Sequence, residues 1–274
     1  MRALGGLIDW LVLAALIVLA LLWMAPVLWI VGLSLKPNDL LAQNLSALPP
    51  FTLRNYADAV TQMPLVHWML NSTVVAICQT LLTLAVASLA GYGFARTNFP
   101  GKRALYWVVL AALLVPTAAT IIPLHAMFTA FGLHNTYLAL ILPRLAWPFG
   151  VVLMTQHFKR ISPELEEAAL LDNAPRFLVF WRIVVPLSLP ALAALGAYTF
   201  IGAWNDFFWP LVSATDPDIY TLTVGIASLQ TGGAAAGGVG VALAQAVLAA
   251  LPMLVVYLFF QRHVLAAVSE WAAD

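Results

Sequence analysis

Long uninterrupted apolar segments constrain this chain more than any other feature. Residues 11–22 contain no polar side chain. A bilayer core about 30 Å thick takes about 20 residues of helix, and the sequence contains six stretches of roughly that length. We therefore predict an all-α polytopic membrane protein with a single transmembrane domain over residues 1–274. The predicted spans are Leu7–Leu33, Met69–Phe94, Ala104–Ala126, Thr136–His157, Pro186–Leu211 and Val239–Phe260.

Composition and charge exclude several other classes of protein. Hydrophobic residues make up 63% of the chain and charged residues 9%, whereas a soluble domain carries about 25% charged residues. The 12 Lys and Arg are balanced by 12 Asp and Glu, so the chain lacks the basic excess of a nucleic-acid-binding protein. The single cysteine, Cys78, excludes an intramolecular disulfide and a cysteine-cluster metal site. We expect no catalytic residue, no metal site and no nucleic-acid partner.

The chain also lacks a nucleotide-binding motif. Gly101-Lys102 is followed by Arg103 rather than by Ser or Thr, so no phosphate-binding loop is present. If this chain takes part in driven transport, the energy must come from another subunit or from an ion gradient.

The positions of the basic residues predict the orientation of the chain, because cytoplasmic loops carry an excess of Lys and Arg. With the N-terminus in the cytoplasm, nine basic residues fall on the cytoplasmic side and only Lys36 and Arg54 fall outside. Arg144 lies within the fourth predicted span. We therefore expect both termini in the cytoplasm.

The cytoplasmic loop 158–185 has the pattern of two short helices joined by a turn. Ser162 can cap the first helix, and Pro163 suits its first position. Asn173 is suited to a left-handed residue at its end. From the residues alone, two interpretations stay open. The loop is either an amphipathic helix at the membrane interface or a docking element for a soluble partner.

The same loop resembles the EAA loop in permease subunits of ATP-binding-cassette importers. Glu167–Ala169 opens that pattern, and Asn173 holds the position where glycine is usual. Ile183, Val185 and Pro186 correspond to the Ile, Leu and Pro that close it. Five of the seven fixed positions match at the correct spacing, and the Gly-to-Asn and Leu-to-Val changes are the two departures.

Two further segments extend the resemblance over nearly the whole chain. Residues 91–96 (Gly-Tyr-Gly-Phe-Ala-Arg), followed by Phe99–Lys102, are similar to a Tyr-Ala-Phe-Ala-Arg…Phe-Pro-Gly-Lys segment of carbohydrate importers. Residues 204–210 (Trp-Asn-Asp-Phe-Phe-Trp-Pro) are similar to their Trp-Asn-Asp-Phe signature. The set resembles the second, maltose-type permease of carbohydrate importers, which has six spans.

This resemblance implies a set of partners and a location. The family works with a second permease subunit, two copies of an ATP-binding subunit and an extracytoplasmic solute-binding protein, in the bacterial inner membrane among its lipids. ATP and Mg would be bound by the ATPase, so this chain would be no enzyme. It would form half of the pathway for a sugar or sugar derivative and couple to the ATPase through its EAA helix. The coupling residues implied are Glu167, Ala168, Ala169, Leu170, Leu171, Asp172, Asn173 and Ala174.

Polar residues inside the predicted spans are candidates for the pathway. Arg144 and Asp206 are ionisable, and such groups within a membrane usually face a bundle interior or an aqueous cavity. Trp204 and Asn205 add an aromatic face and hydrogen-bonding groups that suit sugar recognition. Arg144 and Asp206 could lie on the translocation pathway or form a gating ion pair. They could equally be a structural pair, or both could lie nearer the outer interface, where water is available. An alternative function, a proton-coupled secondary transporter, would use the same two residues.

Overall fold

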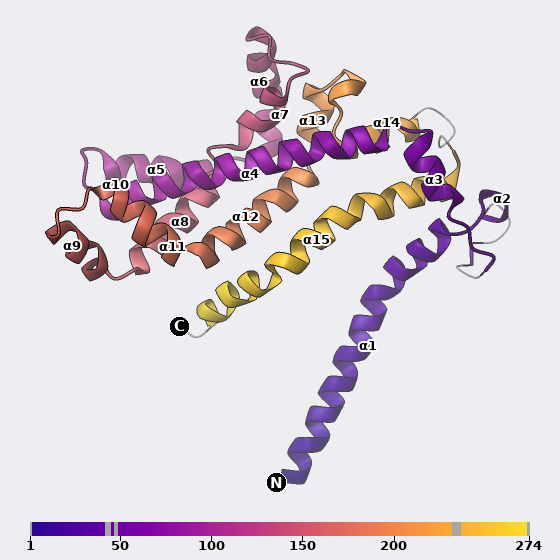
Figure 1. Ribbon diagram of the computed structural model, residues 1–274, viewed down its shortest axis with the longest axis horizontal. Helices are drawn as coiled ribbons and strands as arrows, with labels where there is room; N and C mark the ends of the chain where they lie inside the picture. Colours follow the sequence, from indigo (N-terminus) through magenta and orange to yellow (C-terminus); the bar gives the residue numbers. More distant parts are fainter. Residues whose placement is uncertain (1, 42–44, 47–48, 232–236, 273–274) are drawn as a thin grey trace. The chain divides into compact units, whose positions relative to one another are not determined.

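The computed structural model describes residues 2–41, 45–46, 49–231 and 237–272. Within these ranges every regular element is a helix, which confirms the predicted all-α class (Figure 1). The chain divides into two compact units. The terminal unit contains the described residues up to Val66 together with those of Ile226–Leu251. The central unit contains His67–Gly225 and the described residues from Pro252 onward.

The terminal unit is organised around the end of its first helix, α1 (Arg2–Ser34). Asn55, in α3 (Arg54–Thr61), donates hydrogen bonds from Nδ2 to the carbonyls of Ser34 and Lys36, at 2.8 Å each. The first bond satisfies a carbonyl that the end of α1 leaves without an intrahelical partner, and the second holds the chain just beyond that end. The short helix α2 (Asn38–Leu41) and the first part of α15 (Val239–Ala272) also belong to this unit.

The central unit contains α4, the longest of its helices. Figure 1 shows α4 and α12 running side by side in this unit. Its elements are α4 (Leu65–Arg96), α5 (Lys102–Ala112), α6 (Thr117–Ala130), α7 (Tyr137–Ile141), η1 (Leu142–Arg144), α8 (Pro148–Arg160), α9 (Pro163–Leu171), α10 (Arg176–Val179), η2 (Phe180–Val184), α11 (Val185–Leu187), α12 (Leu189–Trp204), α13 (Phe208–Ser213), η3 (Pro217–Ile219) and the start of α14 (Leu222–Thr231).

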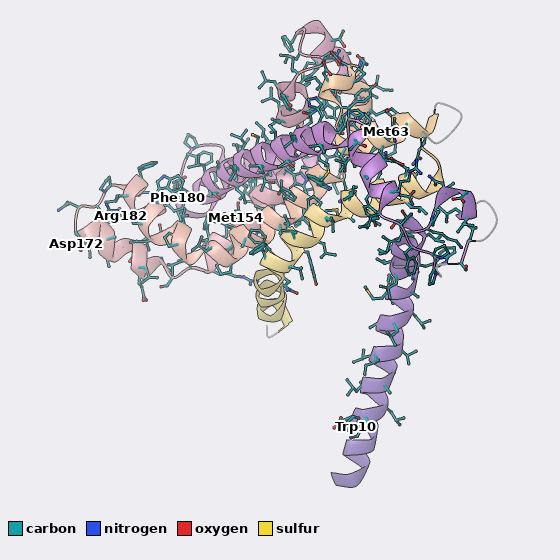
Figure 2. The ribbon with its side chains drawn as sticks, turned by 45° about the vertical axis from the view of Figure 1, so that its right-hand side comes forward. Trp10, Met63, Met154, Asp172, Phe180 and Arg182 are labelled. Carbon is teal, nitrogen blue, oxygen red and sulfur yellow. The ribbon has the colours of Figure 1, made fainter. Side chains whose placement is uncertain are left out.

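One apolar cluster holds α4, α8, η2 and α12 together. Ala87 of α4 packs with Met154 and Phe158 of α8, with Phe180 of η2 and with Leu195 of α12. Figure 2 labels Met154 and Phe180 within this part of the unit. All five side chains are at most 3% exposed, so the cluster fixes α8, η2 and α12 relative to α4.

Three described helices are long and apolar enough to cross a membrane: Asp9–Ser34, Leu65–Arg96 and Val239–Gln261. Three more crossings are possible where two shorter helices join at a bend. The bends measure 103° between α5 and α6, 46° between α7–η1 and α8, and 76° between α10–α11 and α12. Counting each bent pair as one span gives up to six.

The bends divide three segments that the sequence predicts as continuous spans, namely 104–126, 136–157 and 186–211. Proline accounts for the breaks, because its ring disfavours helical geometry at the preceding residue. Pro116 is the N-cap of α6, and Pro148 is the first residue of α8. Pro190 is the second residue of α12, and because it has no N–H it donates no helical hydrogen bond back across the break at Ser188. A further break at residues 205–207 separates α12 from α13.

Candidate functional site

The predicted coupling segment forms the short helix α9. Pro163 occupies its first position and Glu164 lies in its first turn, where a carboxylate meets the positive end of the helix dipole. Ser162 is the N-cap residue, but its side chain makes no capping hydrogen bond. The prediction of the N-cap position is therefore correct, and the predicted hydrogen bond is absent.

The end of α9 is closed by a left-handed residue at Asn173. Its φ is 59°, which confirms the conformation predicted for it. The backbone amide of Asn173 donates a hydrogen bond to the carbonyl of Leu170 at 3.0 Å. The backbone amide of Ala174 donates to the carbonyl of Ala169 at 3.1 Å. This pair of bonds is a Schellman motif, which usually has glycine at this position. Asn173 thus forms the type of turn in which glycine is usual.

The two faces of α9 differ in exposure. Glu167, Ala168 and Leu171 are exposed, and Leu171 shows 83% of its surface. Ala169 is half-buried, whereas Glu166 is only 6% exposed. Of the eight predicted coupling residues, those that present an exposed surface are Glu167, Ala168, Leu170, Leu171, Asp172 and Asn173. Figure 2 shows Asp172 at one extremity of the central unit.

The inward-facing carboxylate of Glu166 joins α9 to the end of α4. Its Oε1 lies 2.7 Å from Nε of Arg96, and its Oε2 accepts a 2.9 Å hydrogen bond from the hydroxyl of Tyr92. Arg96 also donates to the backbone carbonyl of Ile161, just before α9. Nothing in the sequence singles out Glu166, because spacing alone does not show which of two adjacent glutamates turns inward.

Arg144 and Asp206, two of the predicted pathway residues, form an ion pair. Arg144 Nη2 lies 3.1 Å from Asp206 Oδ2. Arg144 is the last residue of η1, and Asp206 lies in the break between α12 and α13. The backbone carbonyls of both residues also accept hydrogen bonds from threonine hydroxyls. Thr83 of α4 donates to the carbonyl of Arg144 at 3.3 Å, and Thr223 donates to the carbonyl of Asp206 at 2.7 Å.

The other two pathway candidates differ from each other in accessibility. Trp204 is 2% exposed, and its ring stacks on Phe200 with an angle of 14° between the planes. Its face is therefore covered in this conformation. Asn205 is exposed and donates from Nδ2 to the carbonyl of Ile201 at 2.9 Å and to the sulfur of Met253 at 3.0 Å.

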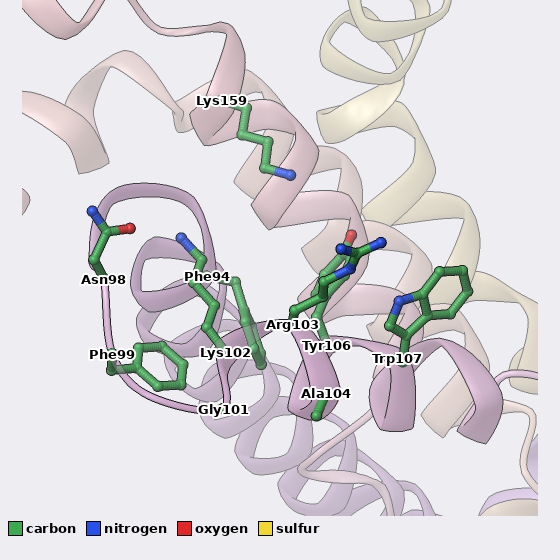
Figure 3. A pocket seen from close by; sticks show the side chains of 10 residues that line it. All are labelled: Phe94, Asn98, Phe99, Gly101, Lys102, Arg103, Ala104, Tyr106, Trp107 and Lys159. Carbon is green, nitrogen blue, oxygen red and sulfur yellow. The ribbon is translucent and has the colours of Figure 1, made fainter.

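A cavity of about 850 Å³ lies beside the N-terminal end of α5 and contains none of the predicted site residues. Figure 3 shows three basic side chains around it, Lys102, Arg103 and Lys159. Lys102 donates to the carbonyl of Thr97 at 2.7 Å. Lys159 lies 5.5 Å from the ring centre of Tyr106, which is cation–π geometry.

Comparisons with known proteins identify the family of this chain. The family model described as "Binding-protein-dependent transport system inner membrane component" matches residues 83–270. The diacetylchitobiose uptake system permease protein NgcG of Streptomyces coelicolor is 32% identical, over 94% of this chain and 86% of that protein. The trehalose transport system permease protein SugB of Mycobacterium tuberculosis is 32% identical, over 90% and 91%.

A solved structure has the same fold. It is that of a bacterial ABC transporter involved in the import of the acidic polysaccharide alginate. The TM-score is 0.81, with 20% identity, and the match covers 94% of this chain and 96% of the other. The chain is a multi-pass membrane protein and no enzyme, and its relatives include sugar permeases. It belongs to the family of inner-membrane permease components of binding-protein-dependent ABC importers.

Proposed function

We propose that this chain is the permease subunit of an ATP-driven importer for a sugar or sugar derivative, and that it couples to a separate ATPase through α9. The observation that carries this proposal is the exposed face of α9. Glu167, Ala168 and Leu171 form a small surface with an acidic edge, on a helix whose end is fixed by the turn at Asn173. Such a surface suits a groove on a soluble partner.

The partners proposed follow from the family. This chain would pair with a second permease subunit, bind two copies of an ATP-binding subunit and receive cargo from an extracytoplasmic solute-binding protein. ATP and Mg would be held by the ATPase. Arg144, Asn205 and Asp206 are the pathway candidates on this chain that are not fully buried. Names of relatives that refer to neutral sugars favour a neutral saccharide as cargo.

Co-purification tests the coupling assignment. The chain would be expressed with its partner permease and ATPase, and the ATPase would be captured in mild detergent. We expect the wild type to be captured with the ATPase and the Glu167→Arg variant not to be captured, because the reversed charge would lie on the docking surface. Asp39→Arg is the matched control, since Asp39 is an exposed carboxylate in the terminal unit. Equal capture of wild type and Glu167→Arg would contradict the docking role of this face.

The alternative of a proton-coupled secondary transporter fits poorly with a subunit of a binding-protein-dependent system. Uptake into proteoliposomes separates the two. The proposal expects uptake to require ATP and the binding protein and to persist when a protonophore is added. Uptake that follows a proton gradient without ATP would instead support the proton-coupled mechanism through Arg144 and Asp206.

A further inference from the structure

We propose that Glu166 is a positioning residue that fastens the coupling helix α9 to α4, so that a displacement of α9 passes along α4 to the Arg144–Asp206 pair. This inference rests on the proposed function of α9 and adds the route by which its motion reaches the membrane-embedded part of the chain.

The fastening begins at the buried face of α9. Glu166 is 6% exposed and is held by two side chains of α4, with Arg96 at 2.7 Å and Tyr92 at 2.9 Å. Arg96 also donates a hydrogen bond to the carbonyl of Ile161, just before α9. The first half of α9 is therefore attached to α4 both at Ile161 and at Glu166. A buried carboxylate held by an arginine and a hydroxyl has a fixed orientation, because leaving any of these groups unpaired is costly.

The connection continues along α4 itself. Tyr92 packs against the rings of Phe158 and Phe180, at centroid distances of 6.1 Å and 5.0 Å. Thr83 lies on the same helix, and its distance from Arg96 is about 20 Å at about 1.5 Å of rise per residue. A continuous helix carries displacement over such a length as a rigid body, since packed elements shift rather than deform.

The far end of this connection reaches the ion pair. The side chain of Thr83 is completely buried and donates to the carbonyl of Arg144 at 3.3 Å, and Arg144 pairs with Asp206 at 3.1 Å. The described contacts therefore form an unbroken series from Glu166 through Arg96 and α4 to Asp206. A shift of α9 would reach the Arg144–Asp206 pair through this series.

Transport stoichiometry tests the proposal in the full complex. Glu166→Gln keeps the shape of the side chain but removes its charge, and Tyr92→Phe removes only one hydrogen bond. We expect both variants to be captured with the ATPase, unlike Glu167→Arg. In Glu166→Gln, sugar transported per ATP hydrolysed in proteoliposomes should fall by about tenfold, within the usual range of coupling between sites. Tyr92→Phe should show a smaller fall.

Two further variants separate positioning from general damage. Arg96→Gln should match Glu166→Gln, and the charge swap Arg96→Glu with Glu166→Arg should recover part of the coupling. A normal ratio of sugar to ATP in Glu166→Gln would overturn the proposal. Loss of ATPase capture in that variant would also overturn it, because Glu166 would then act in docking.

A measurement on the chain alone keeps this test independent of the ATPase. Thermal unfolding of Arg96→Gln, Glu166→Gln and the double variant in detergent forms a double-mutant cycle. We expect the double variant to be clearly less destabilised than the sum of the two single variants. Additive effects would overturn the fastening, whereas a wild type that fails to capture the ATPase would contradict the proposed function and leave this cycle intact.

Discussion

Arg144 Nη2 lies 3.1 Å from Asp206 Oδ2, and each residue sits where a helix has just ended. The pair therefore joins two breaks, one between η1 and α8 and the other between α12 and α13. Breaks expose backbone groups that a membrane cannot solvate, and such groups are tolerated where they are buried in protein or line an aqueous cavity. The ion pair and the bonds from Thr83 and Thr223 supply partners at this point.

The strength of this pair can be measured with a double-mutant cycle. Arg144→Gln, Asp206→Asn and the double variant would be unfolded thermally in detergent. We expect a coupling energy within the usual range of about 0.5–3 kcal/mol for residues in contact, because the two charged groups lie 3.1 Å apart. Strictly additive effects would show that the two residues do not interact in solution.

The turn at Asn173 gives a second prediction. Asn173 has a φ of 59°, a conformation that costs most residues roughly 1–2 kcal/mol and costs asparagine less. We expect Asn173→Ala to lower the free energy of unfolding by about 1 kcal/mol and Asn173→Gly to leave it equal or slightly higher. Thermal unfolding of both variants checks this. If alanine were tolerated as well as glycine, the left-handed turn would be absent in solution.

Much of α9 could be predicted from sequence because its signals are local. Pro163 at the first position and Asn173 after the last turn act through their own backbone geometry, and both are where the pattern predicts them. The apolar stretches likewise reveal the helices. Hydropathy averaged over a window is insensitive to a bend, however, and so the 103° angle before Pro116 was missed.

The tertiary partners could not be predicted, because no local rule joins residues that are distant in sequence. Glu166 and Glu167 are neighbours of the same chemical type, separated by about 100° around a helix of 3.6 residues per turn. Which of them faces inward depends on the position of Arg96 in another helix. Arg144 and Asp206 can be recognised in the sequence as ionisable residues within predicted spans, but their pairing cannot, for the same reason.

Asn71 provides a third prediction, because its described side-chain hydrogen bonds link separate segments. It is 2% exposed, donates to the carbonyls of Asp218 and Tyr220 at 2.9 Å each, and accepts from the hydroxyl of Tyr137 at 2.6 Å. Asn71→Ala leaves the Tyr220 carbonyl and the Tyr137 hydroxyl without this partner, whereas the Asp218 carbonyl still lies 2.8 Å from Nε2 of His67. We expect a loss of about 1–3 kcal/mol in the free energy of unfolding.

Tyr137→Phe is the matched variant for this network. It removes only the hydroxyl, and the free energy of unfolding should fall by about 1 kcal/mol or less. Thermal unfolding would compare both variants with the wild type. A larger loss from Tyr137→Phe than from Asn71→Ala would contradict the central position of Asn71.

The packing of α4 against α8 gives the last prediction, and α4 carries its own control. A Cβ added at Gly91 would lie 2.8 Å from Cβ of Met154 and 3.0 Å from the amide nitrogen of Thr155. Neither atom is at the free end of a flexible side chain, so the two helices would have to separate. We expect Gly91→Ala to cost about 1–3 kcal/mol, as other overpacked cores do.

Gly93 lies on the same helix, with no atom within 4 Å of an added Cβ. Gly93→Ala should therefore raise the free energy of unfolding by about 0.5–1 kcal/mol, because alanine loses less backbone entropy in a helix than glycine does. Thermal unfolding of the two variants under identical conditions measures effects of opposite sign. Equal effects at the two positions would mean that α4 and α8 do not pack closely at Gly91, and the apolar cluster around Met154 would then have to be arranged differently.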